Sequence, residues 1–228
     1  AQAAPARLNA YVRINPDGSI PADNPFFEKA RGKYRAIWAL GLRNPFCFAV
    51  QPGTGRMFAN DVGGSLWEEI DEIVAGGNYG WPHVEGPSTR TEFRGPLLAY
   101  GRTEGKSIAG GVFYNPGTRQ FPASYVGKYL FADFDQNWIK VLDPDDPRAV
   151  TTFATKLLRP VDLQLAPDGS LYVLNRDMWV KDDKFKPSTG SLVRLRYAPA
   201  RAPIRMAPPP PPSHPVALGL PTLPAGLP

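Results

Sequence analysis

The sequence has few residues that could form disulfides or zinc sites, and it has no long apolar run that could span a membrane. It contains one cysteine and two histidines in 228 residues, and 21% of its residues are charged. One cysteine excludes an internal disulfide framework and a structural zinc site built from thiolates, but it does not fix the compartment. No stretch approaches the roughly 18 consecutive apolar residues of a membrane-spanning helix, so we expect no membrane span.

The charge is mildly basic and evenly spread. Lysine and arginine total 26 against 21 acidic residues, for a net charge of +5. The basic residues are interleaved with acids and form no basic run of the kind that binds the phosphate backbone of a nucleic acid. We therefore expect a mixed, solvated surface and no nucleic-acid partner.

Proline, glycine and aromatic residues are abundant. The 27 prolines and 22 glycines disfavour a helical bundle, because they cost about 3 and about 1 kcal/mol in a helix interior. The 5 tryptophans, 9 tyrosines and 12 phenylalanines argue against wholesale disorder. The composition predicts a soluble, turn-rich, all-β domain.

The last thirty residues differ from the rest. Residues 199–228 contain 11 prolines, five of them consecutive, and no acid. Because proline lacks an amide donor and has a fixed φ, this segment predicts a linker or a disordered tail. A ligand for a proline-recognising module is the alternative. We assign residues 7–198 to the folded part and 199–228 to the tail.

A short pattern recurs in the folded part. A glycine, a pair of aliphatic or aromatic residues and an Asn or Asp lead into a second strand-like run, which predicts a β-hairpin. The three copies are Gly55–Asn60, Gly127–Asp133 and Gly169–Asn175. They start 72 and 42 residues apart. The second spacing fits a four-stranded propeller blade, and the first fits a blade with an irregular insertion at Gly76–Thr103.

Further strand candidates surround these hairpins. Ile37–Val50 and Val161–Ala166 each precede a copy, and Leu8–Ile14 predicts an orphan strand from an earlier blade. The chain therefore predicts an incomplete β-propeller of about three blades. Propellers close with typically four to eight blades, so we expect a missing upstream half or assembly with another chain.

Three motifs in order resemble one family. They are Trp38–Phe46 (WALGLRNPF), Asp61–Ile70 (DVGGSLWEEI) and Gly76–Pro82 (GGNYGWP). Together they resemble the glucose/sorbosone dehydrogenase family, the pyrroloquinoline-quinone (PQQ) dependent sugar dehydrogenases, over roughly residues 8–197. The resemblance implies that this chain is the C-terminal half of a six-bladed propeller. It also implies oxidation of an aldose at the anomeric carbon to its lactone, with PQQ, calcium and an external electron acceptor.

The resemblance assigns three residues to PQQ. Arg43 and Asn44 match the Arg-Asn-Pro motif, and a guanidinium fork suits a carboxylate or quinone oxygen. An ion pair with a nearby acid is the alternative for Arg43. We expect Pro45 to end the strand and to leave both side chains at its mouth-facing end. Arg159 matches the first arginine of an Arg-x-Arg-Asp pattern, whose second arginine falls on Val161.

The calcium site departs from the family pattern. Calcium prefers oxygen ligands, which the family draws from backbone carbonyls of the loop matching Gly63 and Gly64. Members that bind PQQ best carry Gly-Pro and Asp-Glu there, whereas this chain has Gly-Gly followed by Glu68 and Glu69. Because these two alternate across a strand, we expect one to face the site and the other to be solvated. At Asp133–Asn137, a string that opens like a calcium loop predicts a hairpin turn.

The catalytic base is the functional group that the motifs of this chain do not supply. Removing the sugar hydroxyl proton as hydride leaves needs a group near pKa 7, normally histidine. The family's catalytic histidine lies upstream, so we expect the base outside this chain. His83 is a candidate substitute, with a surface-loop histidine as the alternative, and His214 belongs to the tail. Tyr79 and Trp81 either stack on a sugar or quinone face or pack the loop.

Two functions stay open at this point. The first is part of a longer, periplasmic or secreted quinoprotein dehydrogenase whose signal lies outside this chain, and we expect the fragment alone to be inactive. The second is a non-catalytic propeller that binds a protein or glycan. Hedgehog-interacting proteins resemble the family in the same Asp-Val-Gly and Asn-Tyr-Gly-Trp motifs. The absent second arginine favours the binding module, and the intact Arg-Asn-Pro motif favours the enzyme.

Overall fold

The computed structural model describes residues 9–176 and 189–198. The segment 199–228, predicted as a linker or tail, lies outside the described residues. Within the described ranges the chain forms strands and two short 3-10 helices, Gly32–Ala36 and Ala123–Tyr125, and no α-helix. The all-β prediction is confirmed. The same residues include no helix with the length and hydrophobicity to cross a membrane.

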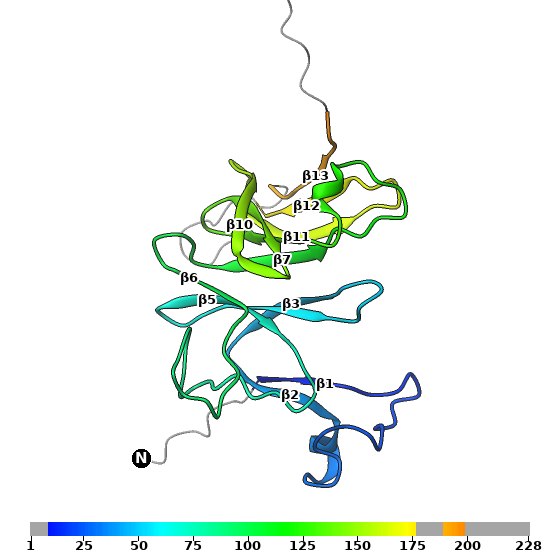
Figure 1. The fold of residues 1–228 in the computed structure, drawn as a ribbon, viewed down its shortest axis with the longest axis vertical. Helices are drawn as coiled ribbons and strands as arrows, with labels where there is room; N and C mark the ends of the chain where they lie inside the picture. The colour runs from blue at the N-terminus through cyan, green and yellow to red at the C-terminus, as the bar shows by residue number, and fades with distance from the viewer. Residues whose placement is uncertain (1–8, 177–188, 199–228) are drawn as a thin grey trace, which may run out of the picture. The chain divides into compact units, whose positions relative to one another are not determined.

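The described strands form antiparallel sheets in which strands adjacent in the sequence pair with one another (Figure 1). Sheet A pairs β1 (Asn9–Val12) with β2 (Ile37–Leu42). Sheet B orders β3 (Pro45–Val50), β4 (Met57–Asp61), β5 (Trp67–Glu72) and β6 (Leu98–Gly101). Sheet C orders β7 (Ile108–Phe113), β8 (Tyr129–Asp133), β9 (Trp138–Asp143) and β10 (Asp146–Ala154). Sheet D orders β11 (Pro160–Leu165), β12 (Leu171–Asn175) and β13 (Ser191–Leu195).

Two predicted segments were wrong. The run Ile37–Val50 is not one strand, because β2 belongs to sheet A and β3 to sheet B. Pro45 begins β3 and does not end a strand; a first strand residue is a position at which proline is tolerated. The segment Gly76–Thr103 is not wholly irregular, since it contains β6, the fourth strand of sheet B. Tyr100 of β6 is buried against sheet C, which fixes this strand in place.

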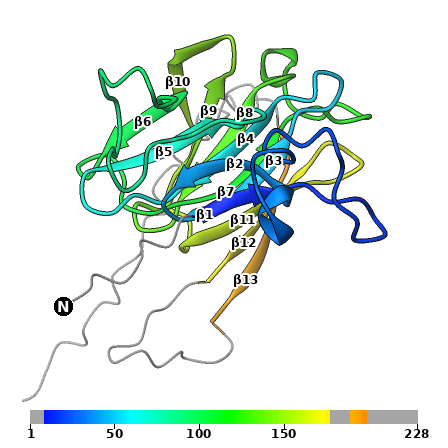
Figure 2. The same cartoon turned by 90° about the horizontal axis from the view of Figure 1, so that it is seen from below.

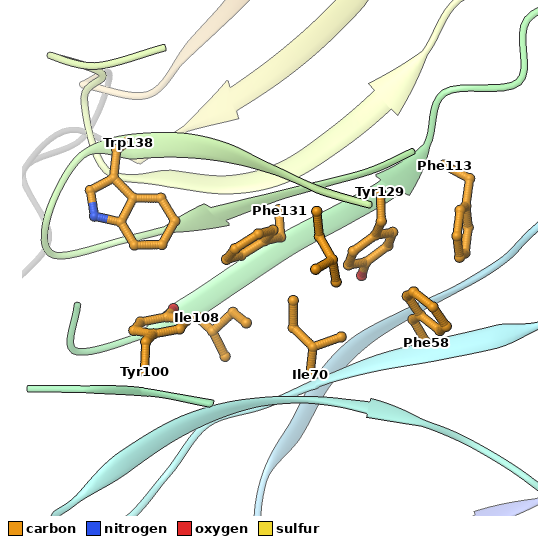
Figure 3. Packing of buried hydrophobic residues seen from close by; sticks show 9 residues of the cluster. Phe58, Ile70, Tyr100, Ile108, Phe113, Tyr129, Phe131 and Trp138 are labelled. Atoms are coloured by element: carbon orange, nitrogen blue, oxygen red, sulfur yellow. The ribbon is translucent and has the colours of Figure 1, made fainter. Parts of the chain in front are cut away.

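The sheets pack face to face through apolar clusters. The cluster between sheets B and C is shown in Figure 3 and comprises Phe58, Ile70, Tyr100, Ile108, Phe113, Tyr129, Phe131, Trp138 and Leu142. Most of its ring pairs meet edge-on or tilted, as for Phe131 and Trp138 with centroids 5.5 Å apart, whereas Tyr129 and Phe131 are stacked. Each such side chain contributes about 1.5–3 kcal/mol on burial. A second cluster joins sheets C and D, and a third joins sheets A and B.

The first strands of sheets B, C and D lie side by side, with β7 between β3 and β11 (Figure 2). Gly110 of β7 permits the close approach to β11. A Cβ atom at Gly110 would lie 2.8 Å from the Cα of Asp162 and 2.8 Å from the amide nitrogen of Leu163. Both are backbone atoms that cannot move aside without shifting the strand, so a side chain at Gly110 would separate the sheets.

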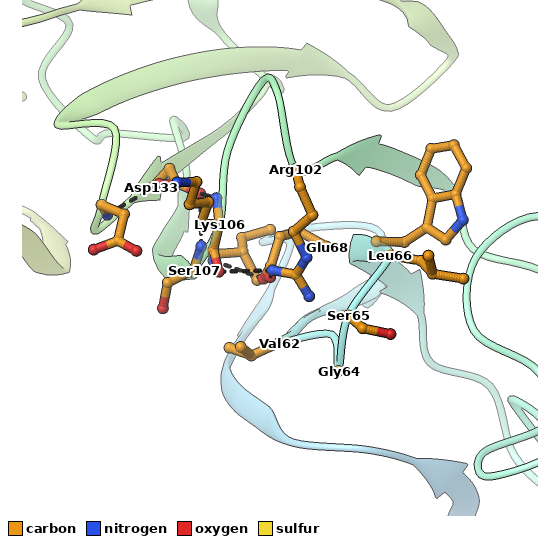
Figure 4. Close-up of polar contacts among 12 residues, drawn as sticks. Val62, Gly64, Ser65, Leu66, Glu68, Arg102, Lys106, Ser107 and Asp133 are labelled. Atoms are coloured by element: carbon orange, nitrogen blue, oxygen red, sulfur yellow. Dashed lines mark hydrogen bonds and ion pairs between the residues drawn. The ribbon is translucent and has the colours of Figure 1, made fainter.

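The buried carboxylate of Glu68 also links sheets B and C (Figure 4). Glu68 on β5 is fully buried, pairs with Arg102, and accepts the amide of Ile108 on β7 at 2.8 Å. Glu69 is buried as well. The expectation that one of these two glutamates is solvated was therefore wrong. Alternation still sends them to opposite faces, but sheets A and C cover both faces of sheet B.

Arg102→Ala should destabilise the protein by about 3–5 kcal/mol, because it leaves the buried Glu68 carboxylate without its cation. Urea unfolding measures the change. Arg148→Ala is the control, since the Arg148 side chain is 96% exposed; it should shift stability by less than about 0.5 kcal/mol. Equal effects of the two variants would show that the pair contributes nothing to stability.

Candidate functional site

The loops that enter β3, β7 and β11 gather at one edge because the three sheets repeat one register. In each sheet, the first residue of the first strand lies opposite a polar residue that ends the second strand. The pairs are Pro45 with Asp61, Ile108 with Asp133, and Pro160 with Asn175. The turn before each first strand therefore lies next to that polar residue.

Asp61 fastens the Arg-Asn-Pro turn in sheet B. Its two carboxylate oxygens accept the amides of Arg43 at 2.8 Å and Asn44 at 2.6 Å. The Arg43 guanidinium donates to the carbonyl of Val62 at 2.8 Å and lies 5.5 Å from the ring centroid of Trp81. Asn44 is exposed. The turn thus fixes the Arg43 guanidinium against the loop that follows β4 and leaves Asn44 accessible.

The Gly63–Gly64 loop wraps around the carboxylate of Glu85. One oxygen of Glu85 accepts four consecutive amides at 2.9–3.1 Å, those of Gly64, Ser65, Leu66 and Trp67. Partial burial raises the pKa of Glu85, but the amide hydrogen bonds outweigh it, so the pKa lies below its usual value. Sequence reasoning missed Glu85, because no local pattern links it to a loop eighteen to twenty-one residues earlier.

Three carboxylates meet beneath this loop. Single oxygens of Asp61, Glu69 and Asp71 lie within 4.8 Å of one another. Asp61 pairs with Glu69 across β4 and β5, and Asp71 follows two residues later on the same face. Asp71 is fully buried, and neither of its oxygens has a hydrogen-bond partner among the described residues. An orphaned, buried carboxyl of this kind fits a cation.

Burial is the largest cause of raised pKa values in this acid cluster. It raises the pKa of Asp61 to about 6, that of Glu69 to about 7, and that of Asp71 well above its usual value. The neighbouring carboxylates add to the shift of Glu69 and Asp71. A divalent cation would reverse this repulsion, because it favours the charged form of every carboxylate around it.

A small cavity lies over the acid cluster. Its volume of about 10 Å³ suits one water-sized body. The lining residues are Gly41, Arg43, Asp61, Gly63, Glu69, Tyr79, Trp81, Val84 and Glu85. Carboxylates and backbone carbonyls are the ligands that calcium prefers. Sequence reasoning named Gly63 and Gly64 but missed Asp61 and Asp71, although the alternation of Glu69 and Asp71 on one strand face was a readable signal.

Arg159 lies at the start of β11, on the far side of β7 from Arg43. Its backbone is in the left-handed region with φ of +56°, and its amide donates to the side-chain oxygen of Asn137 at 2.7 Å. The guanidinium lies 5.5 Å from the ring of Phe134. Its Nη1 atom is buried without a hydrogen-bond partner among the described residues. This unpaired donor fits an anionic oxygen of a ligand.

A second cavity, of about 130 Å³, lies where the three first strands meet. Its lining residues are Phe46, Ser107, Ile108, Ala109, Phe134, Val161 and Arg176. Most come from β3, β7 and β11 or from the turn before β7, whereas Phe134 follows β8 and Arg176 follows β12. The structure therefore brings Arg43 and Gly63 together at the small cavity, and brings the strand starts that follow Asn44 and Arg159 together at the larger one.

The remaining candidates lie on the 76–103 segment. His83 is exposed, its ring stacks on Phe93 with centroids 6.2 Å apart, and it lines neither of these two cavities. The Tyr79 hydroxyl donates to the carbonyl of Glu72 at 2.6 Å and accepts the amide of Val74 at 3.1 Å. Tyr79 thus packs the segment onto sheet B.

Asp133–Asn137 forms the predicted hairpin turn between β8 and β9.

Sheets that stack face to face with their first strands side by side define a protein of the β-propeller type. A family model for glucose/sorbosone dehydrogenases matches residues 1–180, and the chain belongs to that family. The resemblance seen in the sequence and the propeller-type fold are both confirmed. The number of blades stays a prediction.

Individual relatives match parts of the chain. The HIPL2 protein of Arabidopsis thaliana is 35% identical over 178 residues, 67% of this chain and 25% of that protein. Quinoprotein glucose dehydrogenase B of Acinetobacter calcoaceticus is 47% identical over 79 residues, 35% of this chain and 16% of that protein. The chain thus spans a quarter or less of these two relatives.

Solved structures show the same fold. A Thermus thermophilus protein described as an oxidoreductase (glucose dehydrogenase) matches with a TM-score of 0.65 at 27% identity, over 81% of this chain and 54% of that one. The PQQ-bound aldose sugar dehydrogenase of Streptomyces coelicolor matches with a TM-score of 0.63 at 22% identity, over 82% and 51%. The second likeness shows the fold alone. The chain spans about half the length of both structures.

Glu85→Ala should loosen the Gly63–Gly64 loop, because four amides lose a charged acceptor. We expect hydrogen exchange at residues 64–67 to accelerate about 10- to 100-fold, the equivalent of about 1.5–3 kcal/mol. Exchange resolved to single amides measures this. Glu92→Ala is the control, since the Glu92 side chain is 55% exposed. Unchanged exchange in Glu85→Ala would mean that the turn holds its shape without the carboxylate.

Proposed function

We propose that this chain forms part of a PQQ- and calcium-dependent aldose dehydrogenase that oxidises the anomeric carbon to a lactone and uses an external electron acceptor. The observation that carries the proposal is the placement of Arg43 against a buried acid cluster with orphaned oxygens. Membership of a family of sugar dehydrogenases supports it. We propose a periplasmic or secreted location for the enzyme.

Arg43, Asn44 and Arg159 would hold PQQ. PQQ carries three carboxylates and an ortho-quinone, and when bound it supplies the acceptor for the hydride that leaves the sugar. The buried, unpaired Nη1 of Arg159 offers a hydrogen bond to one anionic oxygen. Arg43 is held by Val62 and by its own turn, so little side-chain entropy is lost when it binds. A quinoprotein glucose dehydrogenase among the similar proteins supports this cofactor.

Asp61, Glu69 and Asp71 would hold calcium, with backbone carbonyls of Gly63 and Gly64 as further ligands. Three carboxylates supply the oxygen-rich, negatively charged set that calcium requires. A cation there would also neutralise Asp71, whose oxygens have no other partner among the described residues. Calcium beside Arg43 would add a second positive charge next to the bound anion.

The proton acceptor for the sugar hydroxyl is the missing group. His83 is exposed and stacks on Phe93, away from both cavities, so we do not assign it this role. We propose that residues outside this chain supply the base. The described residues then bind and orient the cofactor, while the remainder of the enzyme contributes the acid–base step.

Binding of PQQ tests the proposal directly. The natural full-length protein, stripped of cofactor, should bind PQQ in the presence of calcium and reduce a dye with aldoses. Arg43→Gln and Arg159→Gln should each weaken PQQ binding about 10-fold or more, because each removes a charged hydrogen bond. Arg148→Gln should bind as wild type. A folded protein that binds no PQQ would support a propeller that binds a protein or glycan.

Asp71→Asn should remove the response to calcium. Wild-type protein should gain about 2.7 kcal/mol of stability when calcium is 100-fold above its Kd, and its Tm should rise accordingly. Asp71→Asn loses a charged ligand and should show little calcium-dependent rise, whereas Glu92→Gln should respond as wild type. Differential scanning fluorimetry with calcium and EDTA measures this. An equal rise in wild type and Asp71→Asn would place any calcium elsewhere.

A further inference from the structure

Sheets B and C repeat an acid followed by an apolar residue at the end of the second strand. These pairs are Asp61-Val62 and Asp133-Phe134. In both sheets the acid accepts the two amides that precede the first strand. Asp61 accepts those of the Arg43–Asn44 turn, and Asp133 accepts those of the Lys106–Ser107 turn at 2.8 and 3.0 Å. In both sheets the carboxylate therefore holds the turn that leads into the first strand.

Sheet D breaks this repeat at the equivalent pair, Asn175-Arg176. Asn175 is buried, and its side-chain oxygen has no hydrogen-bond partner among the described residues. The turn is closed differently, because the Arg159 amide donates to the side-chain oxygen of Asn137 at 2.7 Å. The backbone bond from the Arg176 amide to the carbonyl of Arg159 at 3.0 Å is common to the three sheets, as the equivalent bond from Phe134 to Ser107 shows. The change removes a carboxylate and adds a guanidinium at the place where Arg159 also lies.

Arg176 lines the 130 Å³ cavity together with Val161. It supplies the only charged side chain among the residues that line this cavity in the described structure. Val161 is the residue that takes the place of the second arginine in the family's Arg-x-Arg-Asp pattern. Arg176 and position 161 therefore line the same cavity. The volume suits a carboxylate group and the ring edge that carries it.

We propose that Arg176 is a ligand-binding residue that, with Arg159, holds one carboxylate of a planar polycarboxylate at the start of β11. Identification of that ligand as PQQ rests on the proposed function, whereas the anion site itself does not. A guanidinium suits this role because it stays charged and pairs two parallel N–H groups with a carboxylate.

The test measures binding of two probes to the natural full-length protein freed of cofactor. PQQ is the first, and pyridine-2,4,6-tricarboxylate is the second because it has planar carboxylates but no quinone. Isothermal titration should show that Arg176→Gln weakens both probes about 10-fold or more and lowers the salt dependence of binding. Arg148→Gln removes an exposed charge of the same type and should leave both affinities unchanged.

Two further variants separate a binding role from a structural one. Arg176→Gln combined with Val161→Arg should regain most of the lost affinity, because it returns the cation to the same cavity from the neighbouring strand. Asn175→Asp restores the acid seen in sheets B and C and should also weaken both probes, with circular dichroism and Tm showing that the variants fold.

The outcomes distinguish this inference from the proposed function. Loss of binding of the tricarboxylate in Arg176→Gln, in a protein whose wild type does not bind PQQ, would keep the anion site and overturn PQQ as its ligand. Unchanged affinity for every probe that wild type binds would overturn the role of Arg176 alone. Failure of wild type to bind either probe would overturn both.

Discussion

The turns that enter the first strands of sheets B and C are held by the carboxylate at the end of the second strand, and the candidate site depends on this constraint. Asp61 and Asp133 each accept two amides from the turn that enters the neighbouring first strand. Hydrogen bonds to a charged group contribute about 1.5–3 kcal/mol. They fix the position of each turn relative to the sheet, and with it the direction of Arg43.

Stacking of sheets turns the same carboxylates into a site. Sheet A covers the face of sheet B that carries Asp61, Glu69 and Asp71, so the three acids are removed from water together. Burial of charge is costly unless the charge is paired. Glu68 on the opposite face is paired with Arg102. The acid cluster has no equivalent partner among the described residues for Asp71, and this asymmetry is the reason that we propose a cation on this face.

Much of the fold could be predicted from the sequence. Hairpin signals at Gly127–Asp133 and Gly169–Asn175 correspond to strands β8 and β12, because alternation and turn residues act over a few positions. The split at Pro45 and the strand β6 could not be predicted in this way. Both depend on which neighbouring sheet a segment packs against. The proposed roles of Arg43, Asn44 and Arg159 came from motifs, whereas Asp71, Glu85 and Arg176 emerged only when distant segments were placed in space.

The sequence by itself determined the all-β class, the hairpin order and the family, since composition, turn chemistry and ordered motifs are properties of the chain. The tertiary structure decided what each polar residue faces. Glu68 and Glu69 alternate as the strand requires, yet both are buried because two sheets cover sheet B. Arg176 looks like a strand-end arginine in the sequence and becomes a cavity residue only where β3, β7 and β11 meet. Burial and partnership arise from contacts between remote segments, which no local pattern encodes.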